Sequence, residues 1–328
     1  MVTRYEEYLP TKLDTHKRFQ AENSLAYKND FIDKPVVNLW IKELKRTIAE
    51  KYPKLIFSRR NYKYSNTIDV DIAYKYLGKH KVISALKLIW QILKFDVKEL
   101  KRTYAYYLKK EKDSYDNFGL ISSLKEKYGV KTIFFIPTAD YGKYDKNHGY
   151  KKSVYRVLIQ KLANENACGV HLSYSSNYRK DKIKTEIKRL SKILDKPITK
   201  NRQHYLKLEF PKTYQNLIEN GITEDYSLGY ASTIGFRAGI CSPYLFFDLE
   251  KNIKTELTIH PFQVMDVSLN KYMNLNPREA TQEIKKIIAS VKNVSGHFIS
   301  VWHNSSLSEQ DEWKKWTAVY ERMIEYAK

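Results

Sequence analysis

Apolar and polar residues follow two periodicities that alternate along most of the chain. Runs rich in β-branched and aromatic residues, such as 66–72 and 131–136, are typical of strands. Apolar residues at helical spacing predict helices between these runs, and the helix over 115–128 would end at Gly129. The further predicted strands are 167–172, 202–208, 222–226 and 296–302. The further predicted helices are 36–52, 81–109, 154–164, 180–194, 211–220, 279–291 and 310–327.

This alternation defines the expected fold class. Strands separated by helices form a parallel sheet, and about seven such repeats favour a closed barrel over an open sheet. We therefore expect an α/β protein in which residues 61–328 form a distorted (β/α) TIM-like barrel. Residues 1–60 are expected to form an N-terminal extension that is helical over 36–52.

The most apolar segment, residues 82–95, is interrupted by Lys87 and is too short to span a bilayer. It is therefore predicted to be a buried or half-buried helix. The first residues of the chain show no apolar signal segment, and Cys168 and Cys241 belong to no disulfide framework. These features favour a reducing compartment, and we predict a cytoplasmic protein.

The charge of the chain is strongly positive. It carries 58 basic and 37 acidic side chains, which gives a formal net charge of +21. Such an excess would suit an anionic polymer, a membrane surface or nucleic acid as a partner. The lysines are spread along the whole sequence instead of forming a compact arm, so no specific nucleic-acid site is predicted.

Asp69 and Asp71 stand out in the first predicted barrel strand. Residues two apart in a strand share one face and lie about 7 Å apart, so the two carboxylates point the same way. Like charges repel unless a positive group lies between them or one carboxylate keeps its proton. The pair is therefore either two solvated carboxylates at a strand end or a metal ligand beside a catalytic base.

Other polar side chains occur where later strands end, and barrel enzymes collect their chemistry at this edge. They are His171, Arg202, His204, Asp225 and His303. Carboxylates and imidazoles together suit Zn²⁺ or a similar divalent ion. Each residue also has a structural alternative: a hydrogen-bonded histidine, a surface arginine or an aspartate that caps a turn. Residues lacking this placement are predicted to lie on the surface, namely His16, His80, His148 and His297.

In this order the strand-end residues resemble the motifs of the polysaccharide deacetylases of the NodB-homology type (carbohydrate esterase family 4). The closest likeness is to the long bacterial branch with a degenerate second motif. The matching segments lie within residues 65–304. They are 67–71, 169–175, 202–205, 225–227 and 296–303 for the first to the fifth motif. The last of these segments fits the fifth motif at every fixed position.

Two departures from the family pattern concern the metal ligands. Val70 separates two aspartates that are usually adjacent, and Ser175 stands where the second motif usually has another histidine. His204 occupies a position that is usually proline, and we hypothesise that it replaces the lost ligand. The implied ligand set is then Asp71, His171 and His204. The alternative is a metal-poor site in which Ser175 or Asn177 is a weak substitute.

The resemblance implies hydrolysis of an acetyl group on an acetylated carbohydrate, with a divalent metal ion such as Zn²⁺ as cofactor. Asp69 would be the catalytic base, held ionised by Arg202. The backbone N–H of Tyr205 would contact the oxyanion. His303 would protonate the leaving group, and Asp266 would orient this histidine.

The leading hypothesis is therefore a metal-dependent carbohydrate deacetylase, acting on N-acetyl in preference to O-acetyl groups, in cell-surface polysaccharide metabolism. Another amide or ester hydrolase on the same barrel is one alternative, because a fold does not determine a substrate. A catalytically weakened barrel that binds an anionic glycan or nucleic acid is the other, and its nucleic-acid binding would depend steeply on salt.

Overall fold

One sheet organises the structure, a computed structural model that describes residues 1–79 and 81–328. Its nine strands lie in the order β6-β7-β5-β4-β3-β2-β1-β9-β8. They are β1 (Lys63–Asp69), β2 (Lys131–Ile136), β3 (Ala167–Leu172), β4 (Lys200–Gln203), β5 (Glu224–Asp225), β6 (Tyr244–Asp248), β7 (Ile253–Ile259), β8 (Val264–Met265) and β9 (His297–His303). Neighbouring strands are parallel except for the antiparallel pair β6 and β7. The predicted α/β class with a largely parallel sheet is therefore confirmed.

The barrel is distorted where its two sides meet. β6 and β8, the outer strands of the described sheet, are not neighbours, and the chain crosses from β7 directly to β8 through residues 260–263. In this crossing the backbone N–H of Phe262 donates to the Leu228 carbonyl (3.0 Å), and that of Gln263 donates to the Ile299 carbonyl (3.1 Å). The irregular segment 260–263 thus closes the barrel, because its backbone bonds to Leu228 on one side and to Ile299 on the other.

The strand pattern differs from the prediction in three places. The first strand ends at Asp69, so Asp71 lies just beyond it. Six strands were located and about seven expected, but the described residues contain nine, because residues 244–265 hold three that the pattern did not reveal. β6 is an apolar run of only four residues before Asp248 and is partly exposed, β7 carries Lys254 and Glu256 among its apolar residues, and β8 has two residues. The predicted strand 202–208 is wrong beyond Gln203, because Tyr205 adopts left-handed backbone angles (φ 61°) that end the strand.

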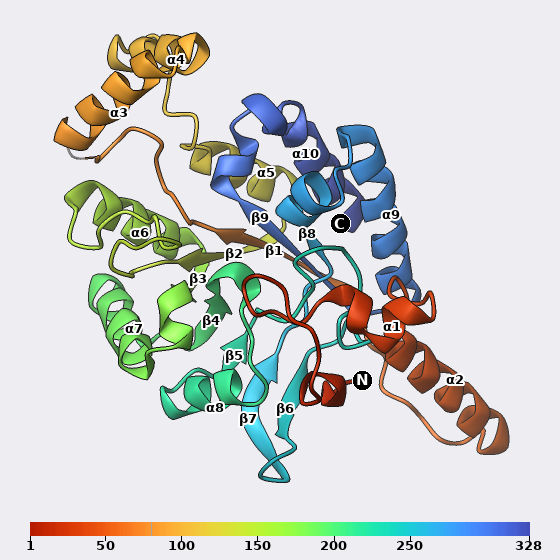
Figure 1. The fold of residues 1–328 in the computed structure, drawn as a ribbon. Helices are drawn as coiled ribbons and strands as arrows, with labels where there is room; N and C mark the ends of the chain where they lie inside the picture. Colours follow the sequence, from red (N-terminus) through yellow and green to blue (C-terminus); the bar gives the residue numbers. More distant parts are fainter. Residues whose placement is uncertain (80) are drawn as a thin grey trace.

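Helices cover the outside of the barrel (Figure 1). They are α5 (Phe118–Tyr128), α6 (Ser153–Glu165), α7 (Lys180–Leu194), α8 (Lys212–Glu219), α9 (Pro277–Asn293) and α10 (Trp316–Ala327). The predicted helices in these regions are confirmed, except that the one predicted over 310–327 begins at Trp316, after a 3-10 turn. Local chemistry sets their ends: Gly129 follows α5 with φ 63°, and Asn276 and Glu279 form a capping box at the start of α9. Their apolar faces pack on the sheet and form the main core.

The region predicted as one helix over 81–109, buried or half-buried over 82–95, is instead a pair of helices. α3 (Lys81–Leu93) and α4 (Val97–Tyr107) are separated by a tight turn in which Phe95 has φ 52° and Asp96 caps α4. The predicted burial is wrong, because Leu93 is 71% and Phe95 is 87% exposed. Apolar residues at helical spacing predicted the helix correctly, but spacing does not say whether a partner surface exists.

Shorter turns complete the chain. These are 3-10 turns at Tyr5–Glu7, Ala21–Asn23, Tyr174–Asn177, His204–Leu206, Asn304–Leu307 and Asp311–Trp313, and a π turn at Ser268–Tyr272. The N-terminal part also contains the short helix α1 (Leu25–Lys28) and the longer α2 (Val36–Lys51), which confirms the helix predicted there. The expected boundary near residue 60 between an extension and the barrel stays a prediction.

The N-terminal residues are tied to the barrel through buried charges. Glu7 accepts hydrogen bonds from Arg4 (2.6 Å) and from Arg237 (2.9 and 2.5 Å), and all three side chains are at most 3% exposed. These two arginines hold the pKa of Glu7 below its usual range, although burial alone would raise it. Breaking this buried network would leave a charge unpaired, so residues 1–8 are firmly docked.

Two histidines predicted to lie on the surface are not there. His148 is 5% exposed, and its Nε2 lies 3.0 Å from the Leu77 carbonyl. His297 is half-buried beside Ser65 (2.8 Å), and burial lowers its pKa to about 4. His16 is half-exposed, and the prediction for His80 lies outside the described residues.

Glu186 on α7 is a buried acid beside the third strand. Its carboxyl group accepts hydrogen bonds from the backbone N–H (2.9 Å) and the hydroxyl (2.6 Å) of Ser173 and is 1% exposed. Burial raises the pKa of Glu186 to about 7, against the effect of these hydrogen bonds.

This pKa predicts a pH-dependent stability. A carboxyl group whose folded pKa is raised stabilises the fold at low pH and loses that contribution as the pH rises through about 7. Glu186→Gln removes the titration, so the free energy of unfolding of the variant, relative to the unmodified protein, should rise by roughly 1–3 kcal/mol from pH 5 to pH 8. Urea denaturation at both pH values measures this difference. Glu325→Gln, at an exposed position, is the control and should show no such change; an equal change in both variants would contradict the assignment.

Candidate metal centre

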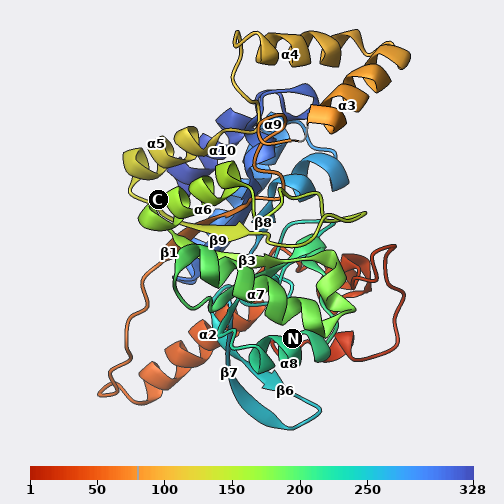
Figure 2. The ribbon, with the colours of Figure 1, turned by 90° about the vertical axis from the view of Figure 1, so that its left-hand side faces the viewer.

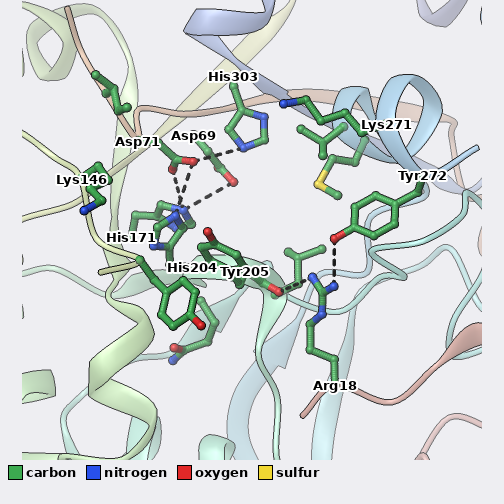
Figure 3. A pocket seen from close by; sticks show the side chains of 16 residues that line it. Arg18, Asp69, Asp71, Lys146, His171, His204, Tyr205, Lys271, Tyr272 and His303 are labelled. Atoms are coloured by element: carbon green, nitrogen blue, oxygen red, sulfur yellow. Dashed lines mark hydrogen bonds and ion pairs between the residues drawn. The ribbon is translucent and has the colours of Figure 1, made fainter. Parts of the chain in front are cut away.

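The carboxyl ends of β1, β3, β4 and β9 meet around a pocket of about 320 Å³ (Figure 3). Six of the eight residues to which the family resemblance gives a role line this pocket. They are Asp69, Asp71, His171, His204, Tyr205 and His303. The other two, Arg202 and Asp266, lie behind the wall and are fully buried. The structure therefore brings these residues together at one edge of the sheet, and their roles stay a prediction.

Asp71 is the centre of this cluster. Its Oδ1 lies 3.1 Å from Nε2 of His171, and its Oδ2 lies 3.5 Å from Nε2 of His204 and 3.6 Å from Nε2 of His303. One ligand atom from each of Asp71, His171 and His204 lies within 4.8 Å of the others. The hypothesised ligand set is thus brought together from three different parts of the chain.

The outer hydrogen bonds of the two histidines define which nitrogen faces Asp71. Nδ1 of His171 lies 2.9 Å from the Arg202 carbonyl, and Nδ1 of His204 lies 2.9 Å from Oδ1 of Asp145. Both partners are acceptors, so each Nδ1 carries the donated proton. If both histidines were neutral, the Nε2 lone pairs of His171 and His204 would then point at the Asp71 carboxylate. That contact is repulsive unless a cation or an added proton lies between each nitrogen and the carboxylate. This arrangement is that of metal-binding histidines oriented by outer acceptors.

The charges of the cluster follow from the same contacts. Burial alone would lower the pKa of His204, but Asp71 and Asp145 raise it to about 9. Burial would raise the pKa of Asp71, yet the neighbouring histidines hold it well below its usual range. Asp71 is therefore ionised, and the site attracts positive charge, which a divalent ion supplies in compact form.

The alternative ligands are engaged elsewhere. The Ser175 hydroxyl lies 3.0 Å from the Ser173 hydroxyl, and the Asn177 side chain donates to Gln203 (3.1 Å). Neither belongs to the cluster of possible ligands among the described residues. The geometry therefore favours His204 over Ser175 as the replacement for the missing histidine.

Asp69 is held beside the ligands by Arg202. The guanidinium donates to Oδ1 of Asp69 (2.8 Å), to the Thr67 hydroxyl (2.8 Å) and to the Tyr226 carbonyl (2.9 Å), and it lies over the Phe135 ring. The other oxygen, Oδ2, lies 3.8 Å from Nε2 of His171. One oxygen of Asp69 is thus fixed in the wall, while the other faces the pocket.

His303 is held by Asp266 in the same way. Oδ1 of Asp266 lies 2.9 Å from Nδ1 of His303, and Oδ2 accepts the His303 backbone N–H (2.8 Å). Burial alone would lower the pKa of His303, but Asp266 and Asp71 raise it to about 10. The predicted pair exists, and its imidazole carries a proton at neutral pH.

Two further sequence candidates, Asp225 and Tyr205, differ in whether they reach the pocket. Asp225 is fully buried and accepts hydrogen bonds from Ser227 and Asn201, so it caps the turn after β5 instead of lining the pocket. Tyr205 lines the pocket. Its backbone is left-handed (φ 61°, ψ 11°), a conformation that residues other than glycine seldom adopt. Such local strain requires support from neighbouring residues.

That support comes from Arg18 in the N-terminal part. Its guanidinium donates to the Tyr205 carbonyl (3.0 Å) and to the Tyr272 hydroxyl (3.0 Å), and Asp14 holds it from the other side (2.6 Å). Arg18 is 7% exposed and lines the pocket. Arg18 therefore contributes the N-terminal part of the chain to the wall of the site. Neither Arg18 nor Asp145 was predicted from the sequence, since neither follows a predicted strand or belongs to a motif.

The comparisons with known proteins give one family match and several structural ones. A family model described as a family of unknown function matches residues 1–53. No curated protein matches the chain. Solved structures of polysaccharide deacetylases are similar across most of its length.

One such structure is a protein from Mycobacterium smegmatis described as a polysaccharide deacetylase (14% identity, 81% of this chain and 85% of that chain covered, TM-score 0.48). Another is the polysaccharide deacetylase Bc1974 from Bacillus cereus (10% identity, 81% and 86% covered, TM-score 0.38). The allantoinase PuuE is also similar (9% identity, 80% and 84% covered, TM-score 0.47). These similarities concern the course of the chain and leave the substrate open.

The geometry predicts which substitution would weaken metal binding. His204→Ala removes one of the three candidate ligands and should weaken the affinity for Zn²⁺ by roughly 100-fold or more. Ser175→Ala removes a hydroxyl that points elsewhere and should leave the affinity unchanged. Isothermal titration with zinc of both variants measures the two affinities, and circular dichroism checks that each is folded. The reverse order of effects would show that the serine is the ligand.

Proposed function

We propose that the protein is a metal-dependent hydrolase that removes an acetyl group from a carbohydrate, N-acetyl in preference to O-acetyl. The observation that carries the proposal is the surroundings of Asp71, which faces the Nε2 atoms of His171 and His204 in a pocket. A carboxylate and two imidazoles leave coordination positions open, as in catalytic zinc sites. A divalent ion on these ligands would act as a Lewis acid and lower the pKa of bound water.

Asp69 is assigned the role of the general base. Arg202 fixes and neutralises one of its oxygens, and the other faces the ligand set at 3.8 Å from His171. A carboxylate held in this way keeps its orientation and can take a proton from a water molecule in the pocket. Because Arg202 is itself fully buried and hydrogen-bonded, the pair has little freedom to move.

His303 is assigned the role of the general acid. Its imidazole carries a proton at neutral pH because Asp266 and Asp71 favour the charged form. An amine is a poor leaving group unless its nitrogen is protonated, so a fixed imidazolium suits amide hydrolysis more than ester hydrolysis. This is the reason for preferring an N-acetyl substrate.

The carbohydrate part of the proposal rests on the five sequence motifs and on the walls of the pocket. Tyr144, Tyr205 and Tyr272 line it, and its volume of about 320 Å³ suits one sugar ring. Pockets of this kind combine apolar faces with a few polar groups that orient a ligand. We extend the proposal to cell-surface polysaccharide metabolism, where acetylated sugars are substrates.

The proposal predicts acetate release from N-acetylated oligosaccharides in the presence of zinc. Asp69→Asn and His303→Ala should each lower kcat by about 10²–10⁴-fold, because each removes a proton-transfer group. A coupled acetate assay measures this rate. Asp181→Asn is the matched control, since Asp181 is an exposed acid outside the pocket.

The opposite result would favour the binding-protein alternative. Tight, salt-sensitive binding of an anionic glycan or nucleic acid by metal-free protein, without acetate release, would contradict hydrolysis.

A further inference from the structure

The α3–α4 hairpin stands clear of the barrel in both views (Figures 1 and 2). Its base is firmly attached: the Asp113 carboxylate accepts the backbone N–H groups of Lys75 (2.8 Å) and Tyr76 (2.7 Å). On α4, Lys98 and Arg102 pair with Asp311 of the body (2.6 and 2.7 Å). The hairpin is thus a fixed projection.

The polarity of α3 is inverted compared with a helix on the surface of a soluble protein. Five of the described side chains of α3 are apolar and between 53% and 71% exposed: Leu86, Ile89, Trp90, Ile92 and Leu93. Phe95 at the tip is 87% exposed. The polar residue Gln91 instead faces α4, where it is 1% exposed and meets the Thr103 hydroxyl (3.4 Å). A surface helix normally turns its apolar side inward, so this face requires an apolar environment.

Exposed lysines accompany the apolar face, one in the turn after α3 and others on and after α4. Residues 81–112 contain nine Lys and Arg against three Asp and Glu. Lys94, Lys101, Lys109 and Lys110 are exposed, and Nζ of Lys94 lies 5.7 Å from the Trp90 ring. Tryptophan together with lysines whose ammonium groups reach into water is typical of protein segments at the boundary between a membrane and water. The apolar side chains of the hairpin therefore suit an apolar layer, and its lysines suit negatively charged groups at the surface of that layer.

The length of α3 excludes crossing of a bilayer. Thirteen residues of helix measure about 20 Å, short of the hydrocarbon thickness of about 30 Å. No described helix is long and apolar enough to span a membrane. A short helix with apolar and basic sides instead lies in the plane of the lipid headgroups.

We propose that the α3–α4 hairpin docks on the surface of an anionic lipid membrane. A second copy of the chain is the less suitable occupant, because it would bring the same excess of positive charge to the contact. The inference does not depend on the hydrolase proposal, since no residue of the metal cluster takes part.

The docking would also place the pocket near the membrane. The hairpin belongs to the connection between β1 and α5, and it leaves the sheet at the edge where Asp69 ends β1. A hairpin held in the headgroup layer keeps this edge of the barrel close to the lipid surface.

Vesicle cosedimentation of the full chain tests the proposal. We expect binding to vesicles of phosphatidylcholine and phosphatidylglycerol in equal amounts, and little binding to phosphatidylcholine alone. Leu93→Glu with Phe95→Glu places charges on the docking face and should lower the partition coefficient by about tenfold or more. Lys94→Glu with Lys101→Glu leaves the apolar face intact and should also weaken binding. Ile56→Glu, at a 93% exposed apolar position away from the hairpin, should have no effect.

Three results would overturn the proposal. One is the absence of binding to the mixed vesicles. Another is equal binding by the unmodified protein and both hairpin variants, which would assign the affinity to the general charge of the chain. The third is a dimer in light scattering that the Leu93 and Phe95 substitutions dissociate, which would make a second copy the occupant. All substituted residues are exposed, and circular dichroism confirms that the variants are folded.

Discussion

The electrostatic surroundings of Asp71 are the constraint on which the rest of the site depends. A carboxylate faces the Nε2 atoms of His171, His204 and His303, and the Nδ1 atom of each ring is already committed to an acceptor. Positive charge must therefore be present among these groups. The fold provides the geometry because β1, which leads to Asp71, is an inner strand of the sheet that pairs with β2 on one side and with β9 on the other.

The fold supports this centre from three sides. Arg202 and Asp266, both fully buried, fix Asp69 and His303 through hydrogen bonds that solvent cannot replace. The third side comes from the N-terminal part, where Arg18 holds the strained backbone of Tyr205. Residues far apart in the chain thus restrict the side chains around the pocket, which is the preorganisation that the proposed hydrolysis requires.

Much of the fold and site follows from the sequence because parallel strands end at one edge. The apolar periodicity located the barrel strands β1 to β4 and β9, and polar residues at their ends identified Asp71, His171, His204 and His303. Asp145 and Arg18 could not be found in this way, because they reach the site from irregular segments whose course depends on tertiary packing. The α3–α4 hairpin illustrates the same limit of prediction. The spacing of apolar residues predicted the helix α3 but not that its apolar side chains are exposed.

The measurement that tests the metal centre most directly is X-ray diffraction from crystals grown with zinc, with data collected on both sides of the zinc absorption edge. The account predicts one anomalous peak within about 2.0–2.2 Å of the Asp71 carboxylate and of Nε2 of His171 and His204. A peak bound by Ser175 or Asn177, or no peak beside Asp71 in protein saturated with zinc, would contradict it.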